Sequence, residues 1–445
     1  MNSVNSGRSL ILADRTNIGI FGRTNAGKST LMNLITGQGT SIVDPKPGTT
    51  ADVVQTIMEV HGLGPLKLFD TAGMDERSEL GMKKKFKTLQ TLKECDLVLL
   101  VVDPSESSKL KDFSVDNEVV SLCRQYEKQL FIIYNVFNPN FNQLGKPSPE
   151  QLAEECQKNI FNSQNTTRIV LDLHAKEAGR QLIDFIKTNY LKKDRKLELL
   201  PFIRPYSFVA MNIPVDEETP QGRLLRPQNV VLDYLLRRMV PFAGYRMDLV
   251  KARSRIAEVR EEERQNYLNF LSELNGESNG LQLVITDSQA IDVVDPWTPK
   301  EIPLTTFSVT MIHYQSNGNL KRFVDGLKVI SALQEGDRIA IAEACNHNRT
   351  CEDIGTVQIP RRLKNKLGIN LDIEFIFGRE FPPEDKLKEY KLLVHCGGCM
   401  IDSQKVNARM DDLLNLTIPI TNYGLLLSYL SGEDTLKRVL KPWGL

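Results

Sequence analysis

The sequence predicts an α/β protein of three domains, and three observations lead to this prediction. A strand, a glycine-rich loop and a helix follow one another over residues 17–35. Towards the C-terminus, apolar strands alternate with helical segments, and such alternation builds a parallel sheet flanked by helices. The length of 445 residues also exceeds what a single hydrophobic core usually serves. We expect the domains to comprise residues 1–192, 193–303 and 304–445.

Charge and composition argue against several classes of protein. Lysine plus arginine and aspartate plus glutamate both number 56, so the net charge of zero favours neither nucleic acid nor an anionic membrane as a partner. The longest fully apolar run, residues 97–102, is too short to cross a bilayer, and no secretory signal is visible. The seven cysteines are expected to be free thiols or metal ligands rather than disulfides. We therefore expect a cytoplasmic protein.

Residues 22–29 read Gly-Arg-Thr-Asn-Ala-Gly-Lys-Ser and match the P-loop pattern G-x-x-x-x-G-K-[ST]. The loop lies between a strand-like segment at 17–21 and a helix, which is the order that a phosphate cradle requires. In such a loop, backbone N–H groups hold the phosphates, Lys28 would reach the β- and γ-phosphates, and Ser29 would ligate Mg²⁺. We expect the nucleotide to contact Gly22, Arg23, Thr24, Asn25, Ala26, Gly27, Lys28, Ser29 and Thr30.

The other parts of a nucleotide-hydrolysing site follow in the expected order. A strand ends at Asp70, which would hold Mg²⁺ through water, and the Gly73 amide would sense the γ-phosphate. Between the P-loop and this strand, a loop contains Thr49 and Thr50, and Thr50 is the better candidate to close over the Mg²⁺. The alternative for both threonines is a plain turn. With Lys28, the residues Thr50, Asp70 and Gly73 form the expected hydrolytic set.

These segments resemble the translation-factor-related, TrmE/Era-like GTPases. Met74 stands where signalling GTPases carry a Gln that orients water, so slow hydrolysis, or help from another group, is expected. Asn25 resembles the P-loop Asn that accompanies an activating K⁺, a cation that would act on the developing phosphate charge.

The base-reading motif departs from the Asn-Lys-x-Asp of that family, because residues 135–138 read Asn-Val-Phe-Asn. Asn135 and Asn138 are expected to lie at the base. An amide both donates and accepts hydrogen bonds, so the selection of guanine is expected to be weaker.

The middle of the chain predicts a small α/β domain without chemistry of its own. Strands are expected at 206–215 and 281–289, and a helix at 229–239. Residues 247–274 are strongly charged, with apolar positions at helical spacing, which is typical of an amphipathic surface helix. One face of this helix is a candidate surface for pairing with another subunit.

The last domain carries two clusters of Cys and His. Strands are expected at 307–312, 338–342, 373–377 and 392–394, with helices at 320–333 and 404–414. Cys345 and His347 follow one strand, and His395, Cys396 and Cys399 end another. Because ligand sites form at the carboxyl ends of strands, these side chains are expected to meet in a metal site. Their chemistry alone leaves structural zinc and an iron–sulfur cluster equally open.

Taken together, the motifs resemble the HydF family of FeFe-hydrogenase maturation GTPases. The resemblance implies a GTPase domain, a dimerisation domain and an iron–sulfur domain. It also implies that Cys345, Cys396 and Cys399 ligate a 4Fe-4S cluster whose fourth iron is left for an exchangeable ligand. His347 and His395 are then candidate labile ligands or hydrogen-bond donors beside the cluster. The resemblance runs nearly end to end and rests on residues 222–224, 286–289, 341–347, 353–355, 359–361, 395–399 and 420–424.

A carrier function is what this resemblance implies. The protein would bind GTP/GDP with Mg²⁺, hydrolyse GTP with stimulation by K⁺, and form a homodimer. Two radical-SAM maturases would make its cargo, a di-iron subcluster precursor, and apo FeFe-hydrogenase would receive it. In a eukaryote, an organelle such as a hydrogenosome would be the compartment. The alternative is an RNA-modification or ribosome-assembly GTPase with a structural zinc site, which the net charge of zero disfavours.

Overall fold

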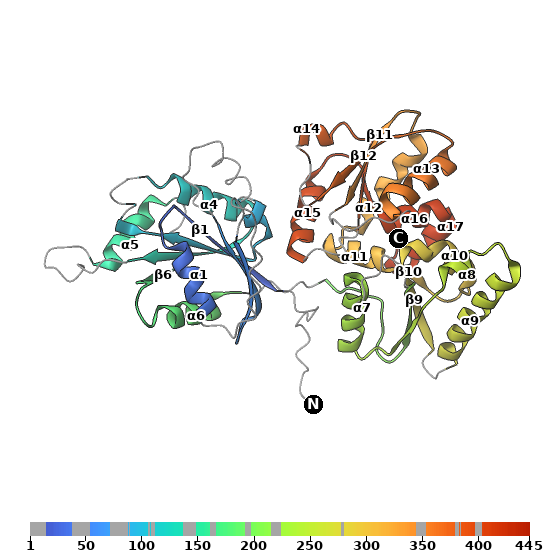
Figure 1. The fold of residues 1–445 in the computed structure, drawn as a ribbon, viewed down its shortest axis with the longest axis horizontal. Coiled ribbons are helices and arrows are strands. Elements are labelled where there is room, and N and C mark those ends of the chain that lie inside the picture. Colours follow the sequence, from blue (N-terminus) through green and yellow to red (C-terminus); the bar gives the residue numbers. More distant parts are fainter. Residues whose placement is uncertain are drawn as a thin grey trace. The chain divides into compact units, whose positions relative to one another are not determined.

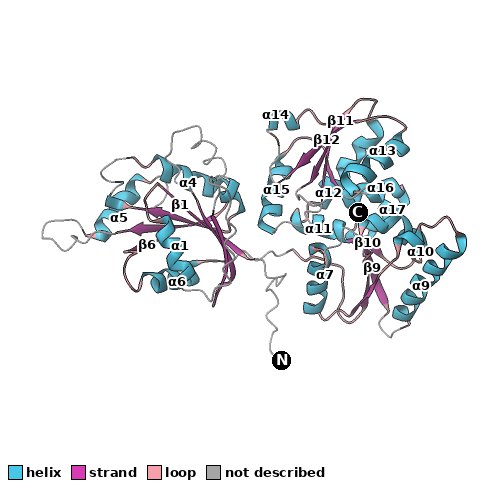
Figure 2. Cartoon of the chain, in the orientation of Figure 1, coloured by secondary structure: helices cyan, strands magenta, loops and turns pink. Residues whose placement is uncertain are grey.

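The computed structural model divides the chain into two compact units, Ala13–Lys193 and Asp194–Leu445, which are taken separately below (Figure 1). Figure 2 shows that each unit combines strands with helices packed around them. The structure describes residues 15–37, 54–71, 88, 90–105, 107, 112–136, 148–160, 166–191, 197–214, 224–276, 280–343, 353–378, 382, 384–396 and 403–445.

The first unit contains a six-stranded sheet of order β2-β3-β1-β4-β5-β6. Only β2 runs antiparallel to its neighbour, β3, and the remaining pairs are parallel. β4 is buried along its whole length and reads Leu-Val-Leu-Leu-Val-Val, as expected of a central parallel strand covered on both faces. The strands are β1 (Thr16–Gly22), β2 (Val54–Val60), β3 (Gly64–Asp70), β4 (Leu97–Val102), β5 (Gln129–Asn135) and β6 (Thr167–Leu171).

Helices cover both faces of this sheet. One core lies between the sheet and the helices α1 (Lys28–Gly37) and α6 (Ala178–Asn189). A second core lies on the opposite face, under α4 (Ser114–Gln125) and α5 (Pro149–Asn159). Strand residues alternate between the two cores, as the two-residue period of a strand requires.

The second unit begins with a four-stranded parallel sheet of order β10-β9-β7-β8. Its strands are β7 (Phe208–Asn212), β8 (Phe242–Tyr245), β9 (Leu281–Thr286) and β10 (Leu304–Thr306). The helices around it are α7 (Arg226–Arg237), α8 (Leu249–Ala252), α9 (Ala257–Asn275), α10 (Ile291–Trp297) and α11 (Phe307–Gln315).

The strand expected at 307–312 is wrong, because these residues form α11. The Thr306 hydroxyl caps the helix by accepting a hydrogen bond from the Val309 N–H at 3.1 Å. Nearly every side chain of α11 is buried, so the segment carries no polar face that would reveal a helical period. Residues 307–311 also alternate between apolar and polar side chains, a pattern that is typical of a strand.

A second four-stranded parallel sheet, of order β12-β11-β13-β14, follows in the same unit. Its strands are β11 (Arg338–Glu343), β12 (Asp372–Phe377), β13 (Leu392–His395) and β14 (Ile420–Asn422). The helices of this part are α12 (Leu320–Gly326), α13 (Ile359–Leu367), α14 (Glu384–Leu387), α15 (Ser403–Asn415), α16 (Tyr423–Ser431) and α17 (Glu433–Leu440).

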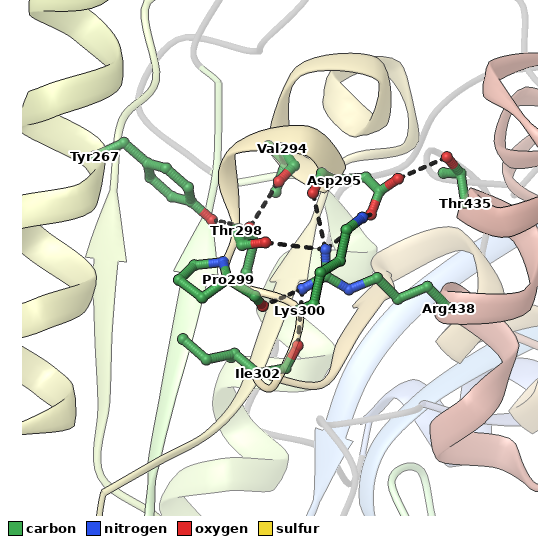
Figure 3. A network of polar contacts seen from close by, with 9 residues as sticks. All are labelled: Tyr267, Val294, Asp295, Thr298, Pro299, Lys300, Ile302, Thr435 and Arg438. Atoms are coloured by element: carbon green, nitrogen blue, oxygen red, sulfur yellow. Dashed lines mark hydrogen bonds and ion pairs between the residues drawn. The ribbon is translucent and has the colours of Figure 1, made fainter.

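One hydrophobic core connects the two sheets of this unit, and a buried polar network joins α17 to the end of α10 (Figure 3). The Arg438 guanidinium donates to the carboxylate and the carbonyl of Asp295, both at 2.8 Å, and to the Thr298 carbonyl at 3.0 Å. The Thr435 hydroxyl donates to the other Asp295 carboxylate oxygen at 2.6 Å. Tyr267 of α9 shares a hydrogen bond with the Thr298 hydroxyl at 2.8 Å. The network therefore ties the C-terminal helix to the middle sheet.

Among the described residues, no helix is both long enough and apolar enough to span a bilayer.

Candidate nucleotide and metal sites

The P-loop lies where the connections of the first sheet change direction. β1 is paired in parallel with β3 on one side and with β4 on the other. In open α/β sheets, ligands bind outside the carboxyl ends of the strands at such a switch point. Residues 23–27 join β1 to α1, so the loop leads directly into a helix N-terminus, where backbone N–H groups and the helix dipole favour an anion.

The backbone of the P-loop needs its glycines. Gly22 and Gly27 have φ values of 145° and 106°, which side chains other than hydrogen rarely tolerate. A Cβ on Gly22 would lie 2.4 Å from the Val101 carbonyl oxygen, and one on Gly27 would lie 2.6 Å from Asn135 Nδ2. Asn25 also has a positive φ, 61°, a conformation that Asn adopts more readily than most residues. The Asn25 side chain is exposed beside the loop.

Ser29 and Asp70 come together at this edge, although 41 residues separate them. The Ser29 hydroxyl donates a hydrogen bond to Asp70 Oδ2 at 2.8 Å. The other carboxylate oxygen, Asp70 Oδ1, is buried and has no hydrogen-bond partner among the described residues. A hydroxyl and a carboxylate placed in this way fit the ligand preferences of Mg²⁺ in P-loop proteins.

Lys28 and Arg23 have different positions in the loop. The Lys28 ammonium is nearly buried and donates to the Arg23 carbonyl at 2.5 Å, so it lies over the loop itself. The Arg23 guanidinium forms an ion pair with Asp112 at 2.9 Å and approaches Asp116 at 3.8 Å. Hydrogen bonds from Ser114, followed by the Arg23 guanidinium, lower the pKa of the Asp112 carboxyl to about 2. Arg23 therefore braces the loop rather than pointing to a phosphate.

The base end of the site is described in part. Asn135 Nδ2 donates to the Ala26 carbonyl at 3.0 Å and so connects β5 with the P-loop. Val136 is buried, and its N–H donates to the Leu171 carbonyl at 2.9 Å. His174 is exposed, with its backbone N–H donating to the Asp172 carboxylate at 2.9 Å. The predicted residues Thr50, Gly73, Met74 and Asn138 lie outside the described residues.

The predicted metal site falls at the switch point of the third sheet. β11 lies between β12 and β13, and its chain continues to β12, whereas β13 continues to β14 on the other side. The register pairs Ala342 with His395, and the Cys396 N–H donates to the Ala342 carbonyl at 3.0 Å. The Cys396 side chain is half-buried at this edge. In the sequence, Cys345 follows the end of β11 by two residues, and it lies outside the described residues.

His395 and Arg409 are buried together beside Cys396. His395 is 0% exposed and Arg409 is 3% exposed. Arg409 Nε donates to His395 Nε2 at 3.3 Å, and Arg409 Nη1 donates to the Gly378 carbonyl at 2.8 Å. Burial, and then the charge of Arg409, hold the pKa of His395 well below its usual value, although the Cys396 backbone acts in the opposite direction. Burial and the Arg409 charge both disfavour the doubly protonated, charged form of the imidazole.

A second buried pair lies at the same edge. The Tyr423 hydroxyl donates to Glu343 Oε1 at 3.0 Å. Gly355 leaves room for this contact, because a Cβ there would lie 2.2 Å from Glu343 Oε1 and 2.3 Å from the Tyr423 hydroxyl. Burial, followed by the charges of Cys396 and Glu343, raises the pKa of Tyr423 well above its usual value, so the phenol keeps its proton.

Three of the predicted metal-site residues, Cys345, His347 and Cys399, lie outside the described residues. Within the described part of the chain, no three His, Cys, Asp or Glu side chains form a group that could hold a metal ion. The thiols of Cys95, Cys123 and Cys156 are buried in the first unit, and burial raises the pKa of Cys95 and Cys123.

Sequence reasoning missed Arg409, Glu343 and Tyr423 as neighbours of the site. Glu343 and Tyr423 stand inside two of the motifs that carried the family resemblance, so their presence there was the available signal. Arg409 belongs to no such motif, and its partners His395 and Gly378 are 14 and 31 residues away. Only the folded chain brings this guanidinium to the sheet edge.

Three family models match the chain. The first, described as a 50S ribosome-binding GTPase, matches residues 17–136. The Hydrogen maturase F dimerization domain matches residues 199–316, and the Hydrogen maturase F tetramerization domain matches residues 321–442. The tetramerization-domain match covers the β12-β11-β13-β14 sheet with His395, the adjoining Cys396, and Arg409 of α15.

Individual relatives match the P-loop part of the chain. GTPase Der of Chloroflexus aurantiacus is 37% identical over 122 residues, which are 26% of this chain and 26% of Der. The tRNA modification GTPase MnmE of Bacteroides thetaiotaomicron is 36% identical over 123 residues, 26% of this chain and 25% of MnmE. The chain thus spans about a quarter of the length of these relatives. Among solved structures, Era of Aquifex aeolicus is similar at 18% identity and a TM-score of 0.31, covering 52% of this chain and 93% of Era.

Proposed function

Because the chain belongs to the HydF family of hydrogenase maturation GTPases, we propose that it is a GTP-hydrolysing carrier that binds a 4Fe-4S cluster and delivers a di-iron precursor to apo FeFe-hydrogenase. The maturase matches over both sheets of the second unit favour this function over RNA modification or ribosome assembly. Both family descriptions also name oligomerisation, which supports assembly of the chain with copies of itself.

The proposed binding of GTP and Mg²⁺ rests on the contacts of the P-loop. GTP phosphates would lie against the backbone N–H groups of residues 23–29, with the Lys28 ammonium exchanging the Arg23 carbonyl for phosphate oxygens. Ser29 and Asp70 would hold Mg²⁺, the first directly and the second through water, since their oxygens already lie 2.8 Å apart. Thr50 and Gly73 would close over the γ-phosphate. Asn135 would lie at the base, held in place by the hydrogen bond that its Nδ2 donates to the Ala26 carbonyl of the P-loop.

Potassium is proposed as the extra activating cation. The Asn25 side chain stands exposed at the rim of the P-loop, where a carbonyl oxygen could ligate K⁺ beside the phosphates. The Met74 side chain cannot orient the attacking water, so hydrolysis needs another group, and K⁺ is the proposed one.

The residues at the third sheet fit the proposed cluster. Cys396 follows the end of β13 directly, and in the sequence Cys345 follows the end of β11 by two residues. The third cysteine, Cys399, follows Cys396 by three residues. Thiolates are the usual ligands of iron–sulfur clusters, and three of them leave one iron free for the cargo. The buried Arg409 adds a positive charge beside His395, the residue before Cys396, and a positive charge there would favour an anionic cluster. When bound, the cluster would supply an open iron position to which the di-iron precursor is attached.

The observation that carries the proposal is the register of β11 with β13. It brings the end of β11, two residues before Cys345, next to Cys396. Two cysteines from distant segments, Cys345 and Cys396, thus follow the ends of neighbouring strands in the sequence, on a unit matched over nearly its whole length by maturase domains. His347 and His395 remain candidates either for labile ligands or for hydrogen-bond donors beside the cluster. The two radical-SAM maturases are the proposed source of the precursor, which is cargo rather than a resident group.

Activation of separately expressed apo-hydrogenase tests the proposal. The wild-type protein, loaded by the two maturases under anaerobic conditions, is expected to activate the hydrogenase, and Cys396→Ala is expected to abolish both activation and iron binding. GTP hydrolysis by Cys396→Ala should stay close to wild type. Cys123→Ala, which removes a buried thiol from the first unit, is the matched control and should keep both properties. Wild-type protein that binds zinc instead of iron, or full activation by Cys396→Ala, would contradict the proposal.

A further inference from the structure

We propose that Arg409 is a positioning residue for the cluster: it holds His395 in a single tautomer out of the iron coordination sphere and places a fixed positive charge beside the cluster, which raises its reduction potential. The inference rests on the proposed function, because it presumes that an iron–sulfur cluster occupies the edge at Cys396. Its evidence is the pair of contacts that Arg409 makes within the described residues.

The first step concerns how Arg409 is held. Its Nη1 donates to the Gly378 carbonyl at 2.8 Å, directly after the end of β12, and its Nε donates to His395 Nε2 at the end of β13. The side chain thus crosses the sheet edge and contacts the chain after two of its strands. At 3% exposure it is a buried cation, and such groups are rare unless they have partners or a role.

The second step concerns the imidazole. A guanidinium has only donors, so the hydrogen bond at 3.3 Å requires His395 Nε2 to carry a lone pair and no proton. A neutral imidazole with Nε2 unprotonated carries its proton on Nδ1. The Nε2 lone pair is directed at Arg409, and the protonated Nδ1 has none to offer a metal. His395 is therefore better placed beside the cluster than on it, in the way that outer groups orient the ligands of many metal sites.

The third step concerns charge. His395 precedes Cys396 directly in the chain, so the Arg409 guanidinium contacts the residue next to a proposed cluster ligand. Reduction adds an electron to the cluster, and a nearby buried positive charge stabilises the reduced form. Solvent screens this charge less than it would an exposed one, because Arg409 is buried. Net charge and hydrogen bonding are among the known determinants of iron–sulfur potentials.

The experiment is a redox titration of reconstituted protein, followed by the paramagnetic signal of the reduced cluster. Arg409→Gln removes the charge and keeps an amide that can donate to the Gly378 carbonyl. It is expected to lower the equilibrium constant for reduction about tenfold, which is a potential more negative by ~59 mV for one electron. Arg409→Lys keeps the charge and should stay near the wild-type potential, even where Arg409→Gln loads too little iron to be measured.

Arg338→Gln is the matched control. Arg338 begins β11, at the edge of the same sheet opposite to the proposed cluster, and pairs with exposed or half-buried carboxylates of Asp372, Glu374 and Glu389. Its removal subtracts the same charge far from Cys396 and should leave the potential unchanged. Equal potentials for wild type, Arg409→Gln and Arg338→Gln would overturn the inference, as would an Arg409→Lys potential lowered as far as that of Arg409→Gln.

A second readout addresses His395 itself. In the reduced wild-type cluster, pulsed paramagnetic resonance is expected to show no strongly coupled imidazole nitrogen from His395. A strong nitrogen coupling that disappears in His395→Gln would show that His395 binds iron, and would overturn the assignment. The two proposals can fail separately: wild-type protein without iron would contradict the proposed function, whereas a loaded cluster insensitive to Arg409 would contradict this inference alone.

Discussion

The Tyr423 hydroxyl donates a hydrogen bond to the Glu343 carboxylate across 3.0 Å, and this contact joins the carboxyl end of β11 to the first residue after β14. Both groups are buried, and 80 residues separate them in the chain. β13, which leads into Cys396, lies between these two strands in the sheet. The pair therefore fixes the strand ends on either side of the candidate cluster ligand.

We predict that Gly355→Ala impairs this edge. The added methyl group would lie 2.2 Å from Glu343 Oε1 and 2.3 Å from the Tyr423 hydroxyl, so the buried pair must separate. Forced rearrangements of this kind typically cost about 1–3 kcal/mol of folding stability. We expect a lower urea midpoint and reduced iron content after reconstitution. Gly276→Ala, where the nearest atom is 3.5 Å from the new Cβ, should leave both unchanged. Full iron loading by Gly355→Ala would show that the site tolerates loss of the pair.

Lys28→Ala should remove nucleotide hydrolysis and leave cluster binding intact. The Lys28 ammonium is the cation placed within the P-loop to meet the phosphates, and losing one well-placed transition-state donor lowers kcat by about 10²–10³. Steady-state phosphate release measures the first effect and iron analysis the second. Lys158→Ala on the exposed end of α5 serves as the control. Hydrolysis by Lys28→Ala within a factor of two of wild type would exclude the P-loop as the hydrolytic centre.

Selection of the base is expected to change with Asn138→Asp. Aspartate accepts hydrogen bonds from both guanine N1 and N2, and hydrogen bonds to a charged group are roughly twice as strong as neutral ones. The variant should therefore prefer GTP over XTP by about tenfold more than the wild type does, since ~1.4 kcal/mol corresponds to a factor of ten. Competition binding with GTP, ATP and XTP gives the ratios directly. An unchanged ratio would mean that Asn138 does not contact the base.

Arg438→Ala is predicted to destabilise the second unit strongly. It would remove the buried cationic partner of the Asp295 carboxylate, whose side chain is 8% exposed, and leave the carbonyls of Asp295 and Thr298 without this donor. Removing one partner of a buried pair costs about 3–5 kcal/mol. Calorimetry should show a lower Tm for the second unit only. Lys437→Ala, one residue earlier and 73% exposed, is the control and should be nearly neutral.

The same network predicts a dependence of stability on pH. Burial pushes the pKa of Asp295 up, but hydrogen bonds from Thr435, Arg438 and Lys300 outweigh it and lower the pKa below the ordinary value of 3.8. A lowered folded-state pKa means that the stabilisation is present above pH ~3.8 and is lost as the pH falls through the folded-state value. Unfolding by urea at several acidic pH values should show this loss in the wild type. In Asp295→Asn, the free energy of unfolding should depend less steeply on pH in the acidic range. An equally steep dependence would show that other carboxylates cause the acid destabilisation.

Local patterns account for what the sequence predicted well. The P-loop, its strand and its helix are contiguous, so spacing alone places Gly22, Gly27 and Lys28, and the glycine φ values match the need of a tight loop. The carboxyl-edge rule likewise predicted that Cys396 lies at the carboxyl edge of a parallel sheet, and β13 ends at His395, directly before it. Residues 307–312 were misassigned because α11 is buried on nearly every side, which erases the helical period.

Long-range polar contacts are what sequence reasoning could not reach. Arg409 looks like any charged residue of an amphipathic helix, and nothing near it in the chain indicates that it turns inward to His395 and Gly378. Arg438 and Asp295 are 143 residues apart and share no motif. Burial of a charge is decided by the folded surroundings, and a single sequence contains no direct record of those surroundings.

The separation of Asp295 from Arg438 bears on how the chain is made. Domains generally fold in order during synthesis, so the middle sheet leaves the ribosome well before its guanidinium partner is translated. Until α17 emerges, the Asp295 carboxylate lacks its hydrogen bonds from Thr435 and Arg438 and has only the exposed Lys300 as a charged partner, so enclosing it carries a desolvation cost. A ribosome that stalls or terminates before α17 would therefore release a nascent chain whose middle sheet stays open to chaperones and proteases.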